Sequence, residues 1–386
     1  MDRANIVIIG GGVIGCAIAM ELAAAHRDVF VLEAAPHVGM GASTRNSGVL
    51  HSGIYYTPGS LKARLCVEGN RLSHEFCEAN SVPLHRTGKI VIATEQNQVH
   101  ALEELAERGR TNGVSGLEVI DRGAMKAREP HVSGVAALSV PSASIVSAEE
   151  LVKAYARIAA QRGANIVTRA LVTGLEARNG VIEVTVEIGE AVGHGTGIAA
   201  EKIEAACVIN SAGLYADEIA AMLGNLQYRI YPVRGEYCEV VKSRADLVRG
   251  LVYPLPHAHG MSLGVHLTRT VWGTVLVGPT AHYVEEKTDY EKNRLPVEEF
   301  VRMAHPLLPE LRASDLRLAY SGLRAKLVPP LDASGNEPAT GAVDWVIRRD
   351  PATPRAIHLI GMESPGLTSA LAIARHIAPM VAETLS

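Results

Sequence analysis

A glycine-rich turn near the start of the chain has the residues needed to bind a dinucleotide. Gly10, Gly12 and Gly15 stand in the spacing G-x-G-x-x-G, directly after the apolar run 6–9. Gly10 permits a tight turn, Gly12 lets the backbone approach a pyrophosphate, and Gly15 allows a helix to pack closely on a strand. Glu33 is placed to accept hydrogen bonds from a ribose diol, and its carboxylate would repel a 2′-phosphate. The pattern predicts a dinucleotide with an unphosphorylated adenosine ribose and leaves NAD and FAD open.

This turn needs a strand before it and a helix after it, and the flanking residues favour both. Residues 6–9 are all β-branched, which is typical of a parallel strand that is buried on both faces. The Ala-rich stretch 16–25 predicts the helix, and the apolar run 29–33 predicts the next strand. Amide groups at the start of the helix would meet the pyrophosphate. Together these elements predict one βαβ unit of a Rossmann-like fold.

Two later segments repeat the order strand, glycine, helix. The strand 206–210 runs into Ser211-Ala212-Gly213 and a predicted helix at 215–223. The strand 357–361 runs into Ser364-Pro365-Gly366 and a predicted helix at 367–385, which Ser364 is expected to cap with Pro365 at the first helical position. Further helices are predicted at 60–80, 96–109 and 148–162, and further strands at 89–93, 164–168, 181–188, 234–241, 261–268 and 271–277.

The order of these elements predicts an α/β fold with two domains. We expect a discontinuous Rossmann-like domain, a parallel sheet with helices, made of residues 1–85, 142–224 and 330–386. Residues 86–141 and 225–329 are expected to form a substrate domain with a mixed or antiparallel sheet, because short strands with frequent Gly and Pro dominate there. A chain of 386 residues is long enough for both domains.

Charge and cysteine content exclude several classes of protein. A net charge of −4 with scattered Lys and Arg gives no basic field for nucleic acid. Five cysteines without a C-x-x-C pair argue against a disulfide framework and a zinc site, so we expect buried reduced cysteines and no metal. No apolar run reaches membrane-spanning length, and the first strand leaves no room for a signal peptide. These features predict a cytoplasmic protein and leave peripheral contact with the inner face of a membrane open.

Four strings of residues carry a resemblance to a known family. They are RNSGVLHSGIYY at 45–56 with PGSLKARLC at 58–66, LGVHLT at 263–268, YSGLRAKL at 320–327, and ESPGLT at 363–368. In this order they resemble the L-2-hydroxyglutarate oxidase/dehydrogenase family, within the D-amino-acid-oxidase-like superfamily of FAD-dependent oxidoreductases. The family usually has proline where Ala325 stands, and an Asp-Phe pair where Asp344-Trp345 stands.

The resemblance implies FAD as the cofactor and indicates which residues hold it. The segment 41–48 is expected to run along the pyrophosphate and the flavin, and the backbone of Val172 to contact the adenine. The N-terminus of the last predicted helix would stabilise negative charge that develops on the flavin during reduction. The full expected set is Gly10, Gly12, Val13, Ile14, Gly15, Glu33, Ala34, Ala42, Ser43, Arg45, Asn46, Ser47, Gly48, Val172, Ser211, Ala212, Gly213, Arg324, Gly361, Ser364, Pro365, Gly366, Leu367 and Thr368.

Oxidation of a 2-hydroxy acid, which the resemblance implies, needs a base for the hydroxyl proton and cations for the carboxylates. We expect His51 as the base because an ordinary histidine pKa of about 6.5 suits proton abstraction near neutrality. A structural or flavin-orienting role for His51 is the alternative, and His266 is the rival base. His257 and His259 lie in a Pro/Gly-rich segment, where the role considered for them is that of lid residues. Arg324 matches the arginine that holds substrate in glycine-oxidase-like enzymes, and its planar guanidinium suits a carboxylate.

A dicarboxylate substrate needs a second cation, and the sequence does not rank the candidates. These candidates are Lys62, Arg64, Arg269 and Lys326. Tyr55 and Tyr253 could hydrogen-bond the substrate, with a packed aromatic role as the equal alternative. Only three Phe and two Trp occur, so no aromatic cage for a quaternary amine is evident.

The expected reaction is the oxidation of a small 2-hydroxy acid, above all L-2-hydroxyglutarate to 2-oxoglutarate, with hydride transfer to FAD. Enzymatic alternatives are oxidation of glycerol 3-phosphate and oxidation of an amino acid or secondary amine. The non-enzymatic alternative is an FAD-binding scaffold or an electron-transfer subunit. The electron acceptor stays open between oxygen, a quinone and an electron-transfer protein.

Overall fold

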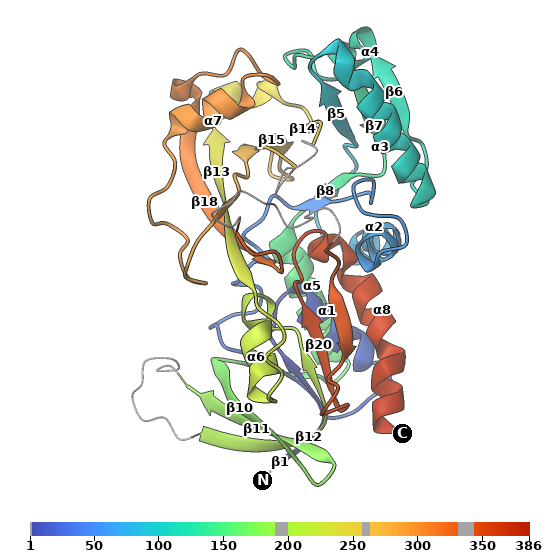
Figure 1. Cartoon of the computed structure of the whole chain (residues 1–386), viewed down its shortest axis with the longest axis vertical. Coiled ribbons are helices and arrows are strands. Elements are labelled where there is room, and N and C mark those ends of the chain that lie inside the picture. The colour runs from blue at the N-terminus through green and yellow to red at the C-terminus, as the bar shows by residue number, and fades with distance from the viewer. Residues whose placement is uncertain (1, 190–199, 257–262, 331–342) are drawn as a thin grey trace.

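The chain folds around two large β-sheets, which follow one another along the long axis of the molecule (Figure 1). The structure, a computed structural model, describes residues 2–189, 200–256, 263–330 and 343–386. The first sheet and its helices lie in the lower half of Figure 1, and the second sheet lies in the upper half. Both contain parallel and antiparallel pairs, which confirms the predicted α/β class.

The strands of the first sheet come from the start, the middle and the end of the chain. They are β1 (Asp2–Ile9), β2 (Val29–Glu33), β9 (Asn165–Thr168), β10 (Ala170–Arg178), β11 (Val181–Ile188), β12 (Ala200–Asn210), β19 (Val346–Arg349) and β20 (Ala356–Ile360). Their order is β10-β11-β12-β1-β2-β9, with β20 beside β12 and β19 beside β20. β1 pairs in parallel with β2 and β12, which confirms the predicted βαβ unit.

Both faces of β1 are covered, which explains why its sequence lacks polar alternation. The helices of this half are α1 (Val13–Leu22), α2 (Leu61–Ala79), α5 (Ala148–Gln161), α6 (Ala216–Met222) and α8 (Gly366–Leu385). Ile6 and Ile8 pack into the core that α1, α5 and α8 share, whereas Val7 and Ile9 pack toward α6 and the β10–β11 hairpin. None of these four side chains is more than 4% exposed, as expected for the central strand of a parallel sheet.

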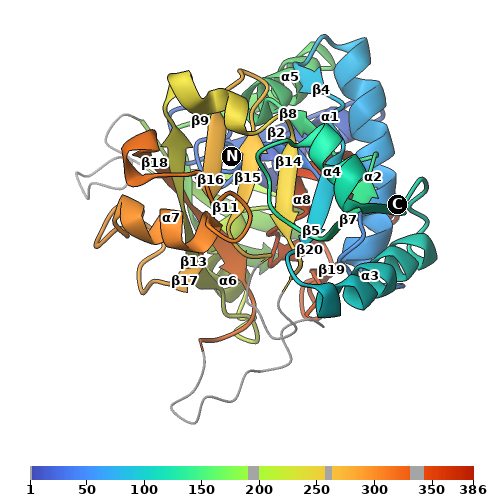
Figure 2. The same cartoon turned by 90° about the horizontal axis from the view of Figure 1, so that it is seen from above.

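The second sheet is built from the two remaining parts of the chain. Its strands are β5 (Lys89–Ala93), β6 (Glu118–Asp121), β7 (Ala136–Val140), β13 (Tyr231–Val240), β14 (Leu251–Pro254), β15 (His266–Arg269), β16 (Val275–Gly278), β17 (His282–Tyr283) and β18 (Leu316–Lys326). Their order is β17-β13-β16-β15-β14-β5-β7-β6, with β18 beside β13. The helices of this half are α3 (Val99–Thr111), α4 (Arg122–Arg128) and α7 (Val297–Ala304), and Figure 2 shows α7 at its left and α3 at its lower right. A small third sheet holds β3 (Val49–Leu50), β4 (Leu84–His85) and β8 (Ser144–Val146).

The strands divide between the two large sheets along the predicted boundaries. All strands of the first sheet lie within 1–85, 142–224 and 330–386, and all strands of the second lie within 86–141 and 225–329. This distribution supports the two-domain division, which we retain as a proposal.

Most predicted helices and strands are present with shifted ends, but the structure also contains elements that were not predicted, namely β3, β4, β6, β7, β8, β10, β14, β17, β18, β19, α4 and α7. β18 is the consequential omission, because it carries Arg324 and Lys326. These residues are two apart on one strand and therefore lie on the same face of the sheet, where both line a cavity. Because Arg324 and Lys326 are charged, they interrupt the apolar run by which a buried strand is predicted from sequence.

The state of the cysteines and the character of the helices can be compared with the expectations from composition. All five cysteines are buried and free, which confirms the expectation for them. Within the described parts of the chain, no helix has the length and apolar character needed to cross a membrane.

Gly15 fixes how closely α1 approaches the turn after β1. A Cβ atom at this position would lie 1.9 Å from the carbonyl oxygen of Gly10, which leaves no room for a side chain. We expect Gly15→Ala to lower the free energy of unfolding by roughly 1–3 kcal/mol, as overpacking does, when measured by urea denaturation. Gly41→Ala is the matched control, because an added methyl there meets nothing within 4 Å. Equal losses for both variants would contradict this reading of Gly15.

Candidate functional site

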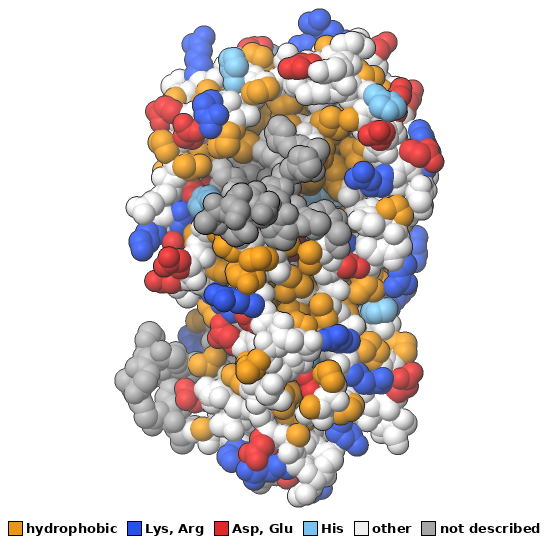
Figure 3. Space-filling model, viewed as in Figure 1, with side chains coloured by type: hydrophobic (Ala, Val, Ile, Leu, Met, Phe, Trp, Pro, Cys, Tyr) orange, Lys and Arg blue, Asp and Glu red, His pale blue; other side chains and the backbone are white. Residues whose placement is uncertain are grey.

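One long cavity of about 1430 Å³ is lined by residues of both large sheets. This volume exceeds the roughly 300–1,000 Å³ of most small-ligand sites, so it has room for a dinucleotide and a further small molecule. Glu33 and Val172 line the part of the cavity beside the first sheet, and His51 and Arg324 line the part beside the second sheet. Hydrophobic side chains gather in the middle of the face shown in Figure 3, while Lys and Arg are interspersed with Asp and Glu.

The glycine turn after β1 forms part of the cavity wall beside the first sheet. Gly10 has a φ of +101°, and a Cβ there would lie 2.7 Å from the carbonyl oxygen of Ser211. The Ser211 hydroxyl donates hydrogen bonds to the carbonyl oxygens of Ile9 and Gly10, at 3.0 and 3.2 Å. The ends of β1 and β12 are thus held against each other. Gly10 itself adds no side chain to this turn, and the turn lines the cavity, so its backbone is accessible to a ligand.

Glu33 lies at the end of β2 with both carboxylate oxygens directed at backbone amides. Oε2 accepts a hydrogen bond from Gly11 and Oε1 accepts one from Ala35, each at 2.7 Å. Burial raises the pKa of Glu33, and the two amide bonds oppose this effect. Each carboxylate oxygen has a second lone pair, so the residue can still accept bonds from a ribose diol.

The segment 42–48 crosses from the first sheet to the second. The Ser43 hydroxyl accepts a hydrogen bond from the amide of Val13 at the start of α1, at 2.8 Å. At the other side, the Tyr320 hydroxyl on β18 donates to the carbonyl oxygen of Asn46, also at 2.8 Å. The guanidinium of Arg45 lies 4.5 Å from the ring centre of Tyr290. This segment therefore ties the glycine turn to the strand that carries Arg324.

Twenty of the expected FAD-binding residues line the cavity, and Gly15, Gly48, Gly361 and Thr368 do not. These four position the lining instead. Gly15 packs on Gly10, a Cβ at Gly48 would meet the carbonyl oxygen of Val146, and a Cβ at Gly361 would meet the side chain of Leu327. The Thr368 hydroxyl accepts a hydrogen bond from the amide of His51, at 2.9 Å.

The start of α8 differs from the prediction. The helix begins at Gly366, with Pro365 as the residue that precedes it, and no side chain caps its first amides. The Ser364 side chain instead hydrogen-bonds Tyr56, so the expected Ser364 cap with Pro365 in the first turn is wrong. The first amides of α8 are consequently left without a side-chain acceptor at the cavity wall.

His51 and His266 both line the cavity; His266 is buried and His51 is half-buried. Burial lowers the pKa of each to about 3, with a smaller contribution from the charge of Lys89. Nδ1 of His51 has no hydrogen-bond partner among the described residues, whereas Nδ1 of His266 lies 2.9 Å from the carbonyl oxygen of Gly264. The ring of His266 also stacks on Tyr253, with ring centres 3.9 Å apart. Both rings are neutral at pH 7, and that of His51 is the less committed to structure.

Three of the cations that line the cavity lie near Glu363. Lys62 and Lys326 place their ammonium groups 3.2 Å from its two carboxylate oxygens. Burial would raise the pKa of Glu363, but Lys62, Lys326 and Arg324 together lower it below the ordinary value. Arg324 donates to the carbonyl oxygen of Thr280, at 3.2 Å.

The structure does not bring Arg64 or Arg269 to the cavity. Arg64 is exposed on α2, and residues two apart on a helix face different directions, so Lys62 reaches the cavity while Arg64 does not. Arg269 donates to the carbonyl oxygens of Ala245 and Val248 and fixes that loop. We drop both as substrate ligands. His257 and His259 lie outside the described residues.

Sequence reasoning missed Glu363 and Lys89. Glu363 begins the ESPGLT string, which was its available signal. Lys89 is fully buried at the start of β5, behind the cavity residues Tyr55 and Tyr253. A lone lysine opening the apolar run 89–93 was the signal for it.

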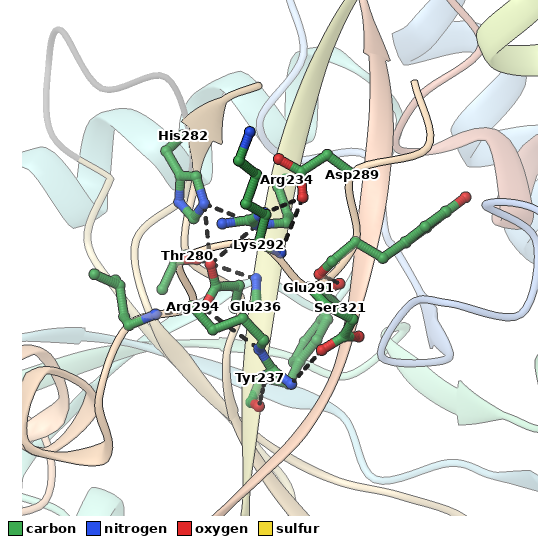
Figure 4. A network of polar contacts seen from close by, with 12 residues as sticks. Arg234, Glu236, Tyr237, Thr280, His282, Asp289, Glu291, Lys292, Arg294 and Ser321 are labelled. Carbon is green, nitrogen blue, oxygen red and sulfur yellow. Dashed lines mark hydrogen bonds and ion pairs between the residues drawn. The ribbon is translucent and has the colours of Figure 1, made fainter. Parts of the chain in front are cut away.

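A buried polar network supports the wall that carries Arg324 (Figure 4). Glu236 on β13 is fully buried; one of its oxygens lies 3.1 Å from Nε of Arg234 and 2.9 Å from Nε2 of His282. The other oxygen accepts a hydrogen bond from the amide of Leu295, at 2.9 Å. The amide of Glu236 donates to Thr280, whose carbonyl oxygen receives the bond from Arg324. The network thus fixes the position of the Arg324 side chain.

Glu236→Gln tests this network, because it keeps the shape of the side chain and removes its charge. Breaking a buried pair typically costs on the order of 3–5 kcal/mol, and we expect a loss of that size in the free energy of unfolding at pH 7. Hydrogen bonds and nearby charges hold the pKa of Glu236 below its ordinary 4.5. Its contribution is therefore complete above pH 4.5 and declines as the pH falls, so the two proteins converge on acidification.

The control for this prediction is Glu285→Gln, which changes an exposed carboxylate in the segment after β17. Urea denaturation of this variant at pH 7 should match the wild type. A Glu236→Gln protein as stable as the wild type would show that the network does not support the wall.

Comparisons with known proteins agree with this geometry. The family model for FAD dependent oxidoreductases (DAO) matches residues 5–380. L-2-hydroxyglutarate dehydrogenase of Escherichia coli (strain K12) is 33% identical, over 99% of this chain and 94% of that protein. The mitochondrial L-2-hydroxyglutarate dehydrogenase of Arabidopsis thaliana is 33% identical, over 98% and 83%. L-alpha-glycerophosphate oxidase from Mycoplasma pneumoniae, solved with FAD bound, has a TM-score of 0.85 at 26% identity, over 99% of this chain and 95% of that one.

These comparisons confirm the family resemblance and the choice of FAD over NAD. The match spans both sheets and every part of the cavity wall described above, including the glycine turn, His51, Arg324 and the start of α8. The chain belongs to the DAO family and is an FAD-dependent oxidoreductase.

Proposed function

We propose that this enzyme oxidises L-2-hydroxyglutarate to 2-oxoglutarate. The observation that carries the proposal is that two neutral histidines and three cations line the same cavity as the glycine turn. The likeness to L-2-hydroxyglutarate dehydrogenases over almost the whole chain supports the substrate.

The residues present fit FAD. Gly10, Gly12 and the start of α1 would receive the pyrophosphate, Glu33 the ribose, and Val172 the adenine. The uncapped amides of α8 would face the flavin and stabilise negative charge there. Bound FAD supplies the acceptor for the hydride that leaves Cα of the substrate.

His51 is the base in this proposal. The pKa of His51, lowered by burial to about 3, differs from the ordinary value of about 6.5 on which the prediction rested, so the neutral ring is a weaker base than expected. Its place in the cavity wall and its unpartnered Nδ1 support the role. The hydrogen bond from its amide to Thr368 holds the residue at the start of α8. His266 is bonded to Gly264 and stacked on Tyr253, which supports a role for it in shaping the cavity.

Three cations, Arg324, Lys62 and Lys326, and two carboxylates, Glu363 and Asp344, lie in the substrate part of the cavity and leave an excess of one positive charge. This excess attracts an anionic substrate. Arg324 would bind the carboxylate next to the reacting carbon through two hydrogen bonds, and the lysine pair would bind the distal one. Glu363 would hold the two ammonium groups in place.

Glycerol 3-phosphate is the second candidate substrate. The structural likeness to L-alpha-glycerophosphate oxidase favours it, and the same cations could bind a phosphate. Oxidation of an amino acid or secondary amine has less support, because a positively charged amine would be repelled by this cluster.

Anaerobic reduction of the bound flavin separates these substrates. We expect L-2-hydroxyglutarate to bleach the flavin absorbance in a stopped-flow experiment, and glycerol 3-phosphate, glycine and D-proline to leave it oxidised. Reoxidation by oxygen and by a soluble quinone then identifies the class of electron acceptor. Rapid bleaching by one of the other compounds alone would assign the enzyme to that substrate instead.

Two substitutions test the residue roles. We expect His51→Ala to lower the rate of flavin reduction about 10²- to 10⁴-fold, the usual contribution of a general base, with FAD retained. We expect Arg324→Ala to lower kcat/KM about a hundredfold, because a charge-assisted bidentate contact to the substrate is lost.

The matched controls are His100→Ala and Arg64→Ala, which change exposed residues outside the cavity. Steady-state kinetics with L-2-hydroxyglutarate should leave both at the wild-type rate. A His51→Ala enzyme of undiminished rate would transfer the role of base to His266, and undiminished function in both site variants would favour a scaffold.

A further inference from the structure

Lys89 is a fully buried lysine that the proposed mechanism does not use. It opens β5, between Val140 of β7 and Leu251 of β14, and no part of it is exposed. Its ammonium nitrogen has no hydrogen-bond partner among the described residues. Burying an ammonium group costs several kcal/mol unless a carboxylate or hydrogen bonds compensate, so a lysine in this position needs an explanation.

Two aromatic rings of the cavity wall surround the ammonium group. The nitrogen lies 4.3 Å from the ring centre of Tyr55 and 4.7 Å from that of Tyr253. Both distances are within the range of a cation–π interaction, which strengthens when the partners are desolvated. Tyr253 in turn stacks on His266. The charge therefore lies one aromatic layer behind the substrate part of the cavity.

The other groups near Lys89 give it little negative charge. Cys66 on α2 would favour its protonation as a thiolate, but burial raises the pKa of this thiol and keeps it neutral. His51 and His266 are also neutral, and the charge of Lys89 lowers the pKa of each. The charge of Arg324 on β18 also lowers the pKa of His266. Arg128 and Glu129 at the end of α4 bond backbone atoms of the segments that precede β5 and β14, at Thr87 and at Arg249. Burial accordingly lowers the pKa of Lys89 to about 7.

We propose that Lys89 is a positioning residue whose ammonium charge completes the site for a dianionic substrate, so that Lys89 takes up a proton from solvent when a dicarboxylate binds above neutral pH. The proposal rests on the proposed function. A dianion in the cavity adds negative charge one aromatic layer away, which favours the protonated amine. By linkage, the protonated enzyme must then bind the dianion more tightly than the deprotonated one.

The pH dependence of dicarboxylate binding tests the proposal. Glutarate is the probe, because it has both carboxylates and lacks the reacting hydroxyl; its dissociation constant is read from the flavin spectrum between pH 6 and 9. For the FAD-loaded wild type we expect this constant to rise above pH 7, by up to about tenfold per pH unit. For Lys89→Met we expect weaker binding at pH 6 and no rise of this kind. Lys89→Arg carries a permanent charge and should bind tightly across the range.

Stability and a control variant separate this role from a structural one. Met replaces a buried charge by a side chain of similar length, so Lys89→Met should retain FAD and melt no lower than the wild type. Lys153→Met removes an exposed lysine that pairs with Glu149 and Glu150 on α5, and should keep the pH dependence of the wild type. If the arginine variant fails to fold, the methionine variant carries the test.

Two results overturn the inference in distinguishable ways. The same rise of the dissociation constant in the wild type and in Lys89→Met would show that Lys89 is not the group that takes up the proton. Absence of glutarate binding to the wild type, together with no flavin reduction by L-2-hydroxyglutarate, would remove the proposed function and this inference with it.

Discussion

The close approach of the backbone at the carboxyl ends of β1 and β12 is the constraint on which the site depends. A Cβ at Gly10 would touch the carbonyl oxygen of Ser211, and one at Gly15 would touch that of Gly10. Because β1, β12 and β20 run in parallel, their glycine turns open at the same edge of the sheet, where α1 and α8 begin. The other parts of the site are attached to this edge: Thr368 in α8 holds His51, and the segment 42–48 reaches β18.

Dehydration governs the chemistry of the other end of the cavity. Burial keeps His51 and His266 neutral and brings the pKa of Lys89 close to neutrality. Glu363 stays ionised in the same environment because two ammonium groups flank it. The site therefore combines a neutral base with an excess of positive charge. In an exposed site, water would weaken the effect of each charge, and the histidines would titrate near their ordinary pKa.

Local patterns in the sequence predicted the βαβ unit and β5 well. The glycine spacing, the acidic residue at the end of β2 and the apolar runs each depend on neighbours along the chain, and β1, α1, β2 and β5 are close to where they were expected. Relations between distant residues were beyond such patterns. The choice of Lys62 over Arg64 depends on which face of α2 meets the cavity, and the pairing of Lys62 with Glu363 joins residues from opposite ends of the chain. Lys89 was missed because its partners are aromatic rings from two other segments.

The central claim is that one cavity combines an FAD site with a base and cations arranged for an L-2-hydroxy dicarboxylate. The most direct test is anaerobic mixing of the FAD-loaded enzyme with the L and D enantiomers of 2-hydroxyglutarate, with the flavin absorbance followed in time. The account predicts rapid bleaching by the L enantiomer and little by the D enantiomer, because fixed positions for base and cations present only one face of Cα for oxidation. Equal bleaching by both enantiomers, or none by the L enantiomer, would contradict it.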